Sequence, residues 1–170
     1  MSTAPASIPR VSDLPADGSL SHWVMVGQVP EEVEDAWSYR TGAVKTVRAV
    51  RAATGEVDAL IDEGWNAWPL VKRAGQAFSG TILLGRAATN DICVAHSSVS
   101  KLHARLRING AEVLVSDASS SNGTIVNGDT VGAGAEVALE SGDLVRFGAC
   151  VFQVFSPAHM TAVLERLREP

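Results

Sequence analysis

Three polar segments decide the fold of this chain: Gly85-Arg86, Ser97-Ser98-Val99-Ser100-Lys101-Leu102-His103 and Asp117-Ala118-Ser119-Ser120-Ser121-Asn122-Gly123-Thr124. Each of them adjoins a short run of apolar residues with the composition or the period-two alternation of a β-strand. The packing of a strand does not require arginine, histidine or asparagine at its end, whereas loops on a rigid scaffold commonly carry binding residues. The three segments therefore predict a site at the strand ends of a β-structure.

The surrounding sequence, from Pro69 to Ser156, consists of short β-type runs separated by Gly, Asn, Asp and Ser, as in an antiparallel sandwich. Between His103 and Ile108, apolar residues alternate with His or Arg, which gives one buried and one exposed face. Asn109-Gly110 then predicts a hairpin, because both central positions of a type I′ turn need positive φ. The expected strands are Leu70 to Arg73, Thr81 to Gly85, Ile92 to Ala95, His103 to Ile108, Glu112 to Asp117, Thr124 to Val126, Glu136 to Leu139, Leu144 to Phe147 and Cys150 to Phe155.

The chain on either side of this region is expected to form appendages. Residues 1–21 are rich in Pro, Ala, Ser and Asp and lack apolar periodicity, which predicts a flexible tail. Ser156-Pro157, followed by apolar residues at helical spacing, predicts a C-terminal helix over residues 157–170.

Residues 22–68 are predicted to form short strand and helix elements that pack on the sandwich. A strand is expected over 23–26, a helical turn over 30–37, and a short helix or turn over 57–68, while residues 41–50 fit either a helix or a strand. We expect the four tryptophans of this extension to bury their rings against the sandwich, although they could instead form a partner surface. They are Trp23, Trp37, Trp65 and Trp68.

Composition narrows the classes of function. The 170 residues are 46% hydrophobic, which suffices for one domain with a core. Without a run of about 18 apolar residues or a signal-peptide pattern, the chain is expected to be a cytoplasmic protein with no membrane partner. A net charge of −5 argues against a nucleic-acid partner, which requires a broad basic surface. Cys93 and Cys150 lack metal-ligand spacing, so no metal, cofactor or disulfide is expected.

The order of the polar motifs is the most specific signal in the sequence. Gly85-Arg86, Ser100-x-x-His103, the segment ending in Asn122-Gly123-Thr124, and Asn127-Gly128 follow one another between about residues 69 and 156. This ordered set resembles the signature of the forkhead-associated (FHA) family. The resemblance implies an all-β fold, an eleven-stranded FHA-type antiparallel β-sandwich over residues 69–156. It also implies a non-catalytic module that binds phosphothreonine peptides on the loops at one end.

Five residues correspond to the family's binding positions. Arg86 corresponds to the arginine that contacts phosphate, and its planar guanidinium can hold two phosphate oxygens at once. Ser100 corresponds to the phosphate-contacting serine, and Lys101 to a variable position that often holds a basic or amide residue. Ser121 stands where the family has Thr or Ser near the phosphate. Asn122 corresponds to the asparagine that bonds the ligand backbone, for which an amide that both donates and accepts is suited.

Five further residues are expected to support the site without touching phosphate. The resemblance makes His103 a structural histidine that ties neighbouring backbone together behind the loops. Gly85 and Gly123 are expected at tight backbone turns, and Thr124 and Asn127 are expected to brace the loops.

The resemblance implies that the partner is a protein phosphorylated on threonine. The chain has no kinase, Walker or Rossmann motif, so a separate Ser/Thr kinase in the same cell is expected to phosphorylate this partner. Two alternatives stay open at this point. The same fold could serve as a phospho-independent interaction or assembly module. A hydrolase using Ser100, His103 and Asp117 is disfavoured, since the chain lacks a Gly-x-Ser-x-Gly motif.

Overall fold

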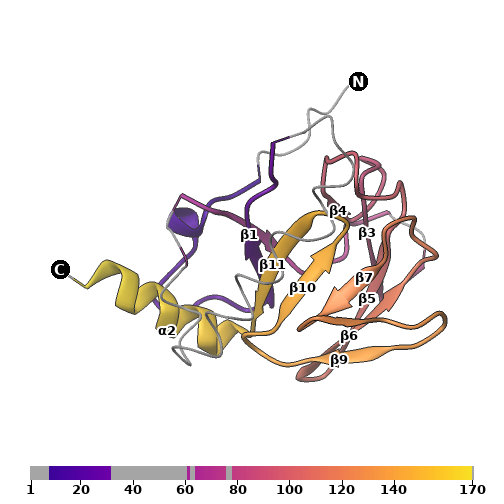
Figure 1. Cartoon of the computed structure of the whole chain (residues 1–170). Coiled ribbons are helices and arrows are strands. Elements are labelled where there is room, and N and C mark those ends of the chain that lie inside the picture. The colour runs from indigo at the N-terminus through magenta and orange to yellow at the C-terminus, as the bar shows by residue number, and fades with distance from the viewer. Residues whose placement is uncertain (1–7, 32–60, 62–63, 76–77, 170) are drawn as a thin grey trace.

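The structure, a computed structural model, describes residues 8–31, 61, 64–75 and 78–169 (Figure 1). The helical turn expected over 30–37, the undecided segment 41–50 and Trp37 fall wholly or largely outside these residues, as does half of the segment 57–68.

Two β-sheets face each other across the molecule, so the predicted all-β sandwich is confirmed. One sheet has six strands in the order β2-β1-β11-β10-β7-β8, and the other has five in the order β4-β3-β5-β6-β9. The six-stranded sheet contains β1 (Val24–Gly27), β2 (Asn66–Pro69), β7 (Thr124–Val126), β8 (Asp129–Thr130), β10 (Leu144–Phe147) and β11 (Cys150–Phe155). The five-stranded sheet contains β3 (Thr81–Gly85), β4 (Ile92–Cys93), β5 (Ala104–Asn109), β6 (Glu112–Asp117) and β9 (Val137–Leu139).

Strand pairing is antiparallel except between β3 and β4, which is a correction to the expected wholly antiparallel sandwich. Leu84 pairs with Ile92 and Gly85 with Cys93, so the loop between them brings the chain back beside the end of β3 in the same direction. Asn90 closes this loop, because its backbone and side-chain N–H groups both donate to Ala87 O, at 3.0 and 2.9 Å. The Asn90 side-chain amide thus bonds a backbone carbonyl that has no partner in a neighbouring strand.

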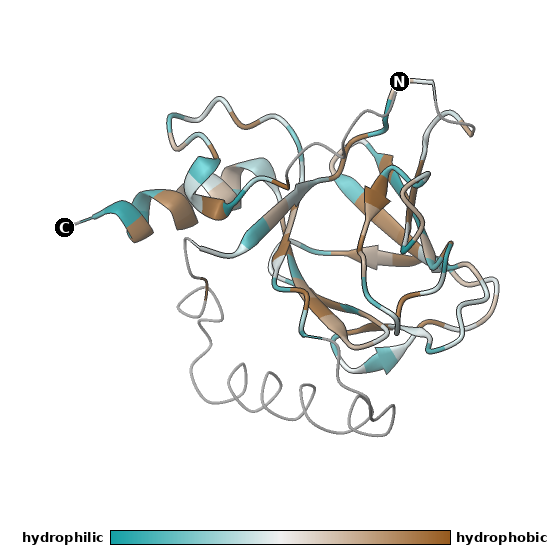
Figure 2. Cartoon of the chain, turned by 90° about the horizontal axis from the view of Figure 1, so that it is seen from above, coloured by the Kyte–Doolittle hydropathy of each residue, from teal (hydrophilic) through white to brown (hydrophobic). Residues whose placement is uncertain are grey.

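Two apolar cores lie on opposite faces of β1 and β11. The main core fills the space between the sheets and contains Met25 and Phe147. The second core lies between the outer face of β1 and the C-terminal helix α2 (Pro157–Arg168), and contains Val24 and Val26. Successive residues of β1 therefore enter different cores, as strand geometry requires. Figure 2 shows apolar residues along both β1–β11 and α2.

Residues 8–21 pack into the second core, so the flexible tail expected over 1–21 is wrong for this part. Val11 is fully buried, and Leu14 is 6% exposed. Backbone bonds of 2.8 Å from Val11 N to Trp65 O and from Ala67 N to Pro9 O add the segment to the edge of β2. A 3-10 turn, η1 (Val11–Asp13), follows. Ala16 and Leu20 also pack partly buried against this core, and α2 supplies its other side.

Three other boundaries differ from those expected. The sandwich includes β1 and β2, so it begins before residue 69. Residues 66–69 form β2 rather than the end of a helix. The strand expected over Leu70 to Arg73 does not form, because the buried carboxylate of Asp91 accepts from Arg73 N at 2.8 Å and from Lys72 Nζ at 2.7 Å. This carboxylate takes the place of a neighbouring strand.

The C-terminal helix is confirmed. Ser156 caps α2 by accepting from the backbone N–H of His159, and Pro157 occupies the first turn. Trp23 and Trp68 lie in the main core, while Trp65 packs partly buried against the second. Among the described residues, no helix is long and apolar enough to cross a membrane.

Candidate functional site

The five predicted binding residues gather at one end of the sandwich. They lie at the end of β3, in the loop between β4 and β5, and in the loop between β6 and β7. Backbone bonds join the first two segments: Arg86 N donates to Ser100 O at 2.8 Å, and Ala87 N donates to Lys101 O at 3.2 Å. The third segment is joined by Ser121 N, which donates to Ser100 Oγ at 3.0 Å. Three chain segments far apart in sequence thus form one surface.

Gly85 lets the first two segments approach each other. A Cβ at this position would collide with the carbonyl of Lys101, so no other residue fits without displacing backbone. The same carbonyl accepts from Asn90 Nδ2 at 2.6 Å. The position of Arg86 is therefore fixed by its neighbours' backbone.

The cationic side chains of the site are available to a ligand. Arg86 and Lys101 are exposed, and neither head group has a hydrogen bond or ion pair with any described residue. Ser100 is half-buried, and because its Oγ accepts from Ser121 N, its hydroxyl hydrogen can still be donated. Two cations and a hydroxyl donor thus face solvent together, an arrangement suited to an oxyanion.

His103 joins two of the loops from behind. Ser100 N donates to its Nδ1 at 3.0 Å, so this nitrogen is an acceptor, and Nε2–H donates to Gly123 O, also at 3.0 Å. The ring is fully buried and lies edge-on to Phe147, with centroids 5.6 Å apart. Burial lowers the pKa of His103, with partial opposition from its bond to Gly123 and from the charge of Asp117. The imidazole is therefore neutral, and it bonds the backbone of Ser100 rather than the hydroxyl, unlike the base of a hydrolase.

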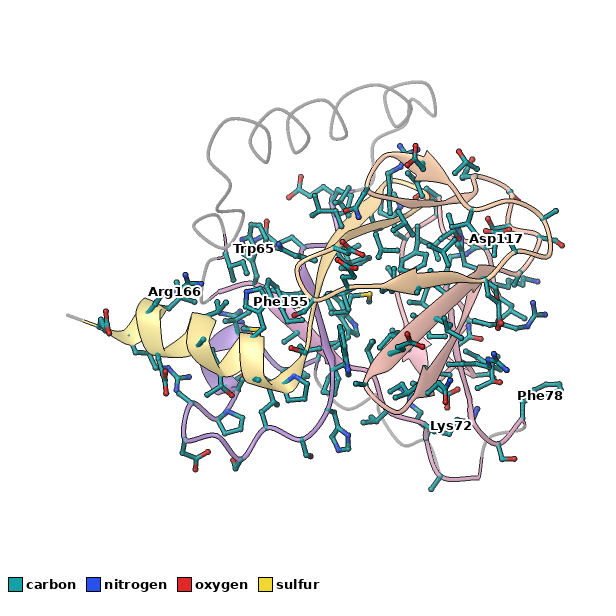
Figure 3. All side chains as sticks on the ribbon, turned by 90° about the horizontal axis from the view of Figure 1, so that it is seen from below. Trp65, Lys72, Phe78, Asp117, Phe155 and Arg166 are labelled. Atoms are coloured by element: carbon teal, nitrogen blue, oxygen red, sulfur yellow. The ribbon has the colours of Figure 1, made fainter. Side chains whose placement is uncertain are left out.

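Asp117 organises the loop that carries Ser121 and Asn122. Its carboxylate accepts from Ser120 N at 2.9 Å, Ser120 Oγ at 2.7 Å and Thr124 Oγ1 at 2.7 Å. Burial alone would raise the pKa of Asp117, but these hydrogen bonds lower it. Asp117, labelled in Figure 3, and Ser120 were missed as supporting residues, although their spacing of three is typical of local side-chain-to-backbone turns.

The other residues expected to support the site divide into two groups. Thr124 is fully buried on Asp117, and Gly123 has a φ of +80°, which favours glycine. Asn127 lies beyond the far end of β7, where its Nδ2 donates to Asp143 Oδ1 at 2.8 Å and its Oδ1 accepts from Leu144 N at 3.0 Å. The structure thus places Asn127 at a turn away from the binding loops.

Asn122 is held through half of its amide. Its Nδ2 donates to Ser98 O at 2.8 Å, and its Oδ1 makes no hydrogen bond to the described residues. The side chain therefore presents an acceptor and a second N–H to a ligand. Among the described residues, no group of His, Cys, Asp and Glu could hold a metal ion.

The described residues thus form a β-sandwich that carries cationic and hydroxyl donors on the loops at one end, an arrangement suited to an anion. The sequence model of the FHA domain matches residues 82–148 of the chain. A comparison with curated proteins finds no match.

The chain is also similar to solved structures of FHA domains. The chain is 32% identical to the FhaA FHA domain, solved in complex with the intracellular domain of Rv3910, over 48% of this chain and 87% of that one, with a TM-score of 0.41. It is 27% identical to Mycobacterium tuberculosis EmbR in complex with a low-affinity phosphopeptide, over 53% of this chain and 21% of that one (TM-score 0.45). It is 28% identical to an FHA domain from Chlamydia trachomatis, over 53% and 84% (TM-score 0.44). The match thus spans about a fifth of EmbR. The chain belongs to the FHA domain family.

Proposed function

We propose that this protein is a non-catalytic reader of phosphothreonine on a partner protein. The observation that carries the proposal is the convergence of Arg86, Ser100, Lys101, Ser121 and Asn122 on one exposed surface. The charges of Arg86 and Lys101 and the hydroxyl hydrogen of Ser100 are not used within the described part of the chain, so all three can donate to a ligand. A phosphothreonine carries about −1.5 to −2 charge at pH 7 and offers three acceptor oxygens, which matches this set.

Each side chain has a distinct role in the proposed complex. Arg86 holds two phosphate oxygens through its guanidinium, and Lys101 adds a mobile point charge. The hydroxyl of Ser100 donates a directional bond without another buried charge. Asn122 bonds the peptide backbone beside the phosphothreonine, and Ser121 lines the phosphate with its hydroxyl. The match to the FHA domain model and the solved complex of EmbR with a phosphopeptide support a phosphopeptide ligand.

The partner is proposed to be a protein phosphorylated on threonine by a Ser/Thr kinase in the cytoplasm, with no nucleic acid or membrane involved. The chain acts by binding alone. Its acidic net charge of −5 supports recognition by a small local cluster of cations rather than by a basic field.

The experiment starts with an oriented phosphothreonine peptide library, from which one preferred peptide is selected. Calorimetry then compares this peptide with its unphosphorylated and phosphoserine forms. We expect a Kd in the micromolar range, about −7 to −9 kcal/mol, and at least about tenfold weaker binding without phosphate. Phosphoserine should bind less well by about 1 kcal/mol or more, since it lacks the buried methyl group. Equal binding of the phosphorylated and unphosphorylated peptides would instead favour the phospho-independent interaction module.

A further inference from the structure

Ser98 lies directly behind the binding surface and belongs to none of the sets described above. The residue is 6% exposed, and its neighbour in space, His96, is 1% exposed. Both are in the loop between β4 and β5 that also carries Ser100 and Lys101. A buried serine needs partners for its hydroxyl and its peptide groups, and those of Ser98 come from three separate parts of the chain.

The hydroxyl of Ser98 is used in both directions. Ser98 N donates to His96 Nδ1 at 3.1 Å, so this nitrogen carries no hydrogen. The hydroxyl, 2.8 Å from the same nitrogen, must therefore donate to it. Its oxygen then accepts from Ala149 N at 2.8 Å. Ser98 thus connects its own loop to the turn between β10 and β11, 51 positions away in sequence.

The carbonyl of Ser98 serves the third segment. It accepts from Nδ2 of Asn122, which fixes the orientation of that amide toward a ligand. The turn between β10 and β11 also reaches this segment, because Gly148 N donates to Gly123 O at 3.4 Å. Gly148 packs so closely on Ser98 that an added Cβ would collide with the Ser98 carbonyl. Ser98 and Gly148 therefore form a buried junction beneath the exposed Asn122, and the Ser98 carbonyl bonds the amide of Asn122 from below.

We propose that Ser98 is a positioning residue for phosphopeptide binding. Its hydroxyl fastens the β4–β5 loop, which carries Ser100 and bonds Asn122 through the Ser98 carbonyl, to the turn between β10 and β11. The proposal rests on the proposed function. Without the hydroxyl, the Ser98 carbonyl loses its fixed place, and the amide of Asn122 and the N–H of Ser121 move more freely. The binding surface then pays an ordering cost each time a peptide binds.

The chain contains a matched control at the other end of β10. Ser141 Oγ lies 2.8 Å from His159 Nδ1 and accepts from Ser156 N at 2.8 Å. Its hydroxyl thus bonds one histidine nitrogen and one backbone N–H, as that of Ser98 does, but it joins α2 to the sandwich. The variant Ser98→Ala removes such bonds beside the turn that follows β10, and Ser141→Ala removes the same kind of bonds before β10 begins.

The test measures the melting temperature of both variants and their affinity for the phosphothreonine peptide selected from the library. We expect similar losses of melting temperature, a rise in Kd of at least about fivefold for Ser98→Ala, and a change within about twofold for Ser141→Ala. Hydrogen exchange in the free protein should quicken at the amides of Ser121 and Gly123 only in Ser98→Ala. If Ser98→Ala does not fold, Ser98→Cys and Ser141→Cys carry the same comparison.

Two results would overturn the proposal: unchanged affinity in the Ser98 variant, or equal loss of affinity in both variants, which would show an effect of stability alone. If the parent chain binds no phosphothreonine peptide, the proposed function fails together with this inference. If the parent binds and only the Ser98 result is negative, the proposed function stands.

Discussion

Arg86 is the residue whose removal should separate binding from folding. Its side chain is exposed, while its position is set by backbone bonds that alanine would keep. Arg86→Ala should therefore weaken binding of the phosphothreonine peptide by more than about tenfold, because a charge-assisted hydrogen bond contributes about 1.5–3 kcal/mol. Calorimetry gives the affinity, and circular dichroism should show an unchanged melting temperature.

Two variants serve as controls for this measurement. Arg86→Lys keeps the charge without two parallel donors, so it should restore only part of the affinity and show a stronger dependence on salt. Arg166→Ala removes an exposed arginine from α2, at the opposite end of the molecule from Asp117 in Figure 3, and should bind normally. Normal binding by Arg86→Ala would place the phosphate elsewhere.

The neutral state of His103 should make stability depend on pH. Its pKa is lowered in the folded protein, so the unfolded chain binds more protons near neutrality. The resulting stabilisation is complete above the unfolded pKa of about 6.5 and is lost as the pH falls through the lower, folded value. Urea unfolding at pH 7.5 and pH 5.5 should show this loss. The variant His103→Asn should show a smaller loss over the same interval, and an identical pH dependence would contradict the assignment.

At the residue scale, local motifs predicted the exposed part of the site, and tertiary contacts supplied the rest. Arg86, Ser100 and Asn122 stand in short motifs whose order identified the loops. Ser98 could not be singled out in this way, because its partner Ala149 is 51 positions distant. A serine in a loop is common, and only burial distinguishes this one.

At the scale of elements, the segment around η1 should contribute to stability as part of the second core. Val11→Ala removes two buried methyl groups and should lower the free energy of unfolding by about 2 kcal/mol. Ser12→Ala is the control, since the Ser12 side chain is exposed and only its carbonyl accepts from Arg168 Nη2, at 3.0 Å. Its effect should stay within about 0.5 kcal/mol. Urea denaturation of both variants measures these changes. Equal stability of Val11→Ala and Ser12→Ala would show that residues 8–21 contribute no core packing.

Element types were predictable where alternation and turn residues agreed, as in β5 with Asn109-Gly110. Element types could not be predicted where a side chain, rather than a neighbouring strand, bonds the backbone. Asp91 accepts from the backbone of Arg73 and Leu83, which lets residues 70–73 run beside the sheet without joining it. Nor could composition predict the ordering of residues 8–21, because the apolar surface that orders them comes from α2 at the other end of the sequence.

At the scale of the whole molecule, the main core is in contact with the binding loops, while the second core stabilises the fold away from them. The main core reaches the binding loops through Phe147, whose ring packs on His103. The second core lies across β1 and β11 from it, where Figure 3 shows Phe155 and Trp65 beside α2 and away from Asp117. A loss of packing in the main core should therefore weaken peptide binding, whereas a loss of packing in the second core should not.

Phe147→Leu and Val163→Ala test this division. Both side chains are almost completely buried, and each substitution should lower the free energy of unfolding by about 1–3 kcal/mol. Val163 lies in α2, so its loss should leave the Kd for the phosphothreonine peptide unchanged at a temperature where the protein stays folded. Phe147→Leu should raise the Kd, because the His103 ring loses its edge-on partner and the bonds from this ring to Ser100 and Gly123 become less well fixed. Calorimetry at matched folded fractions measures the difference, and an equal rise in Kd for both variants would mean that the second core also shapes the binding loops.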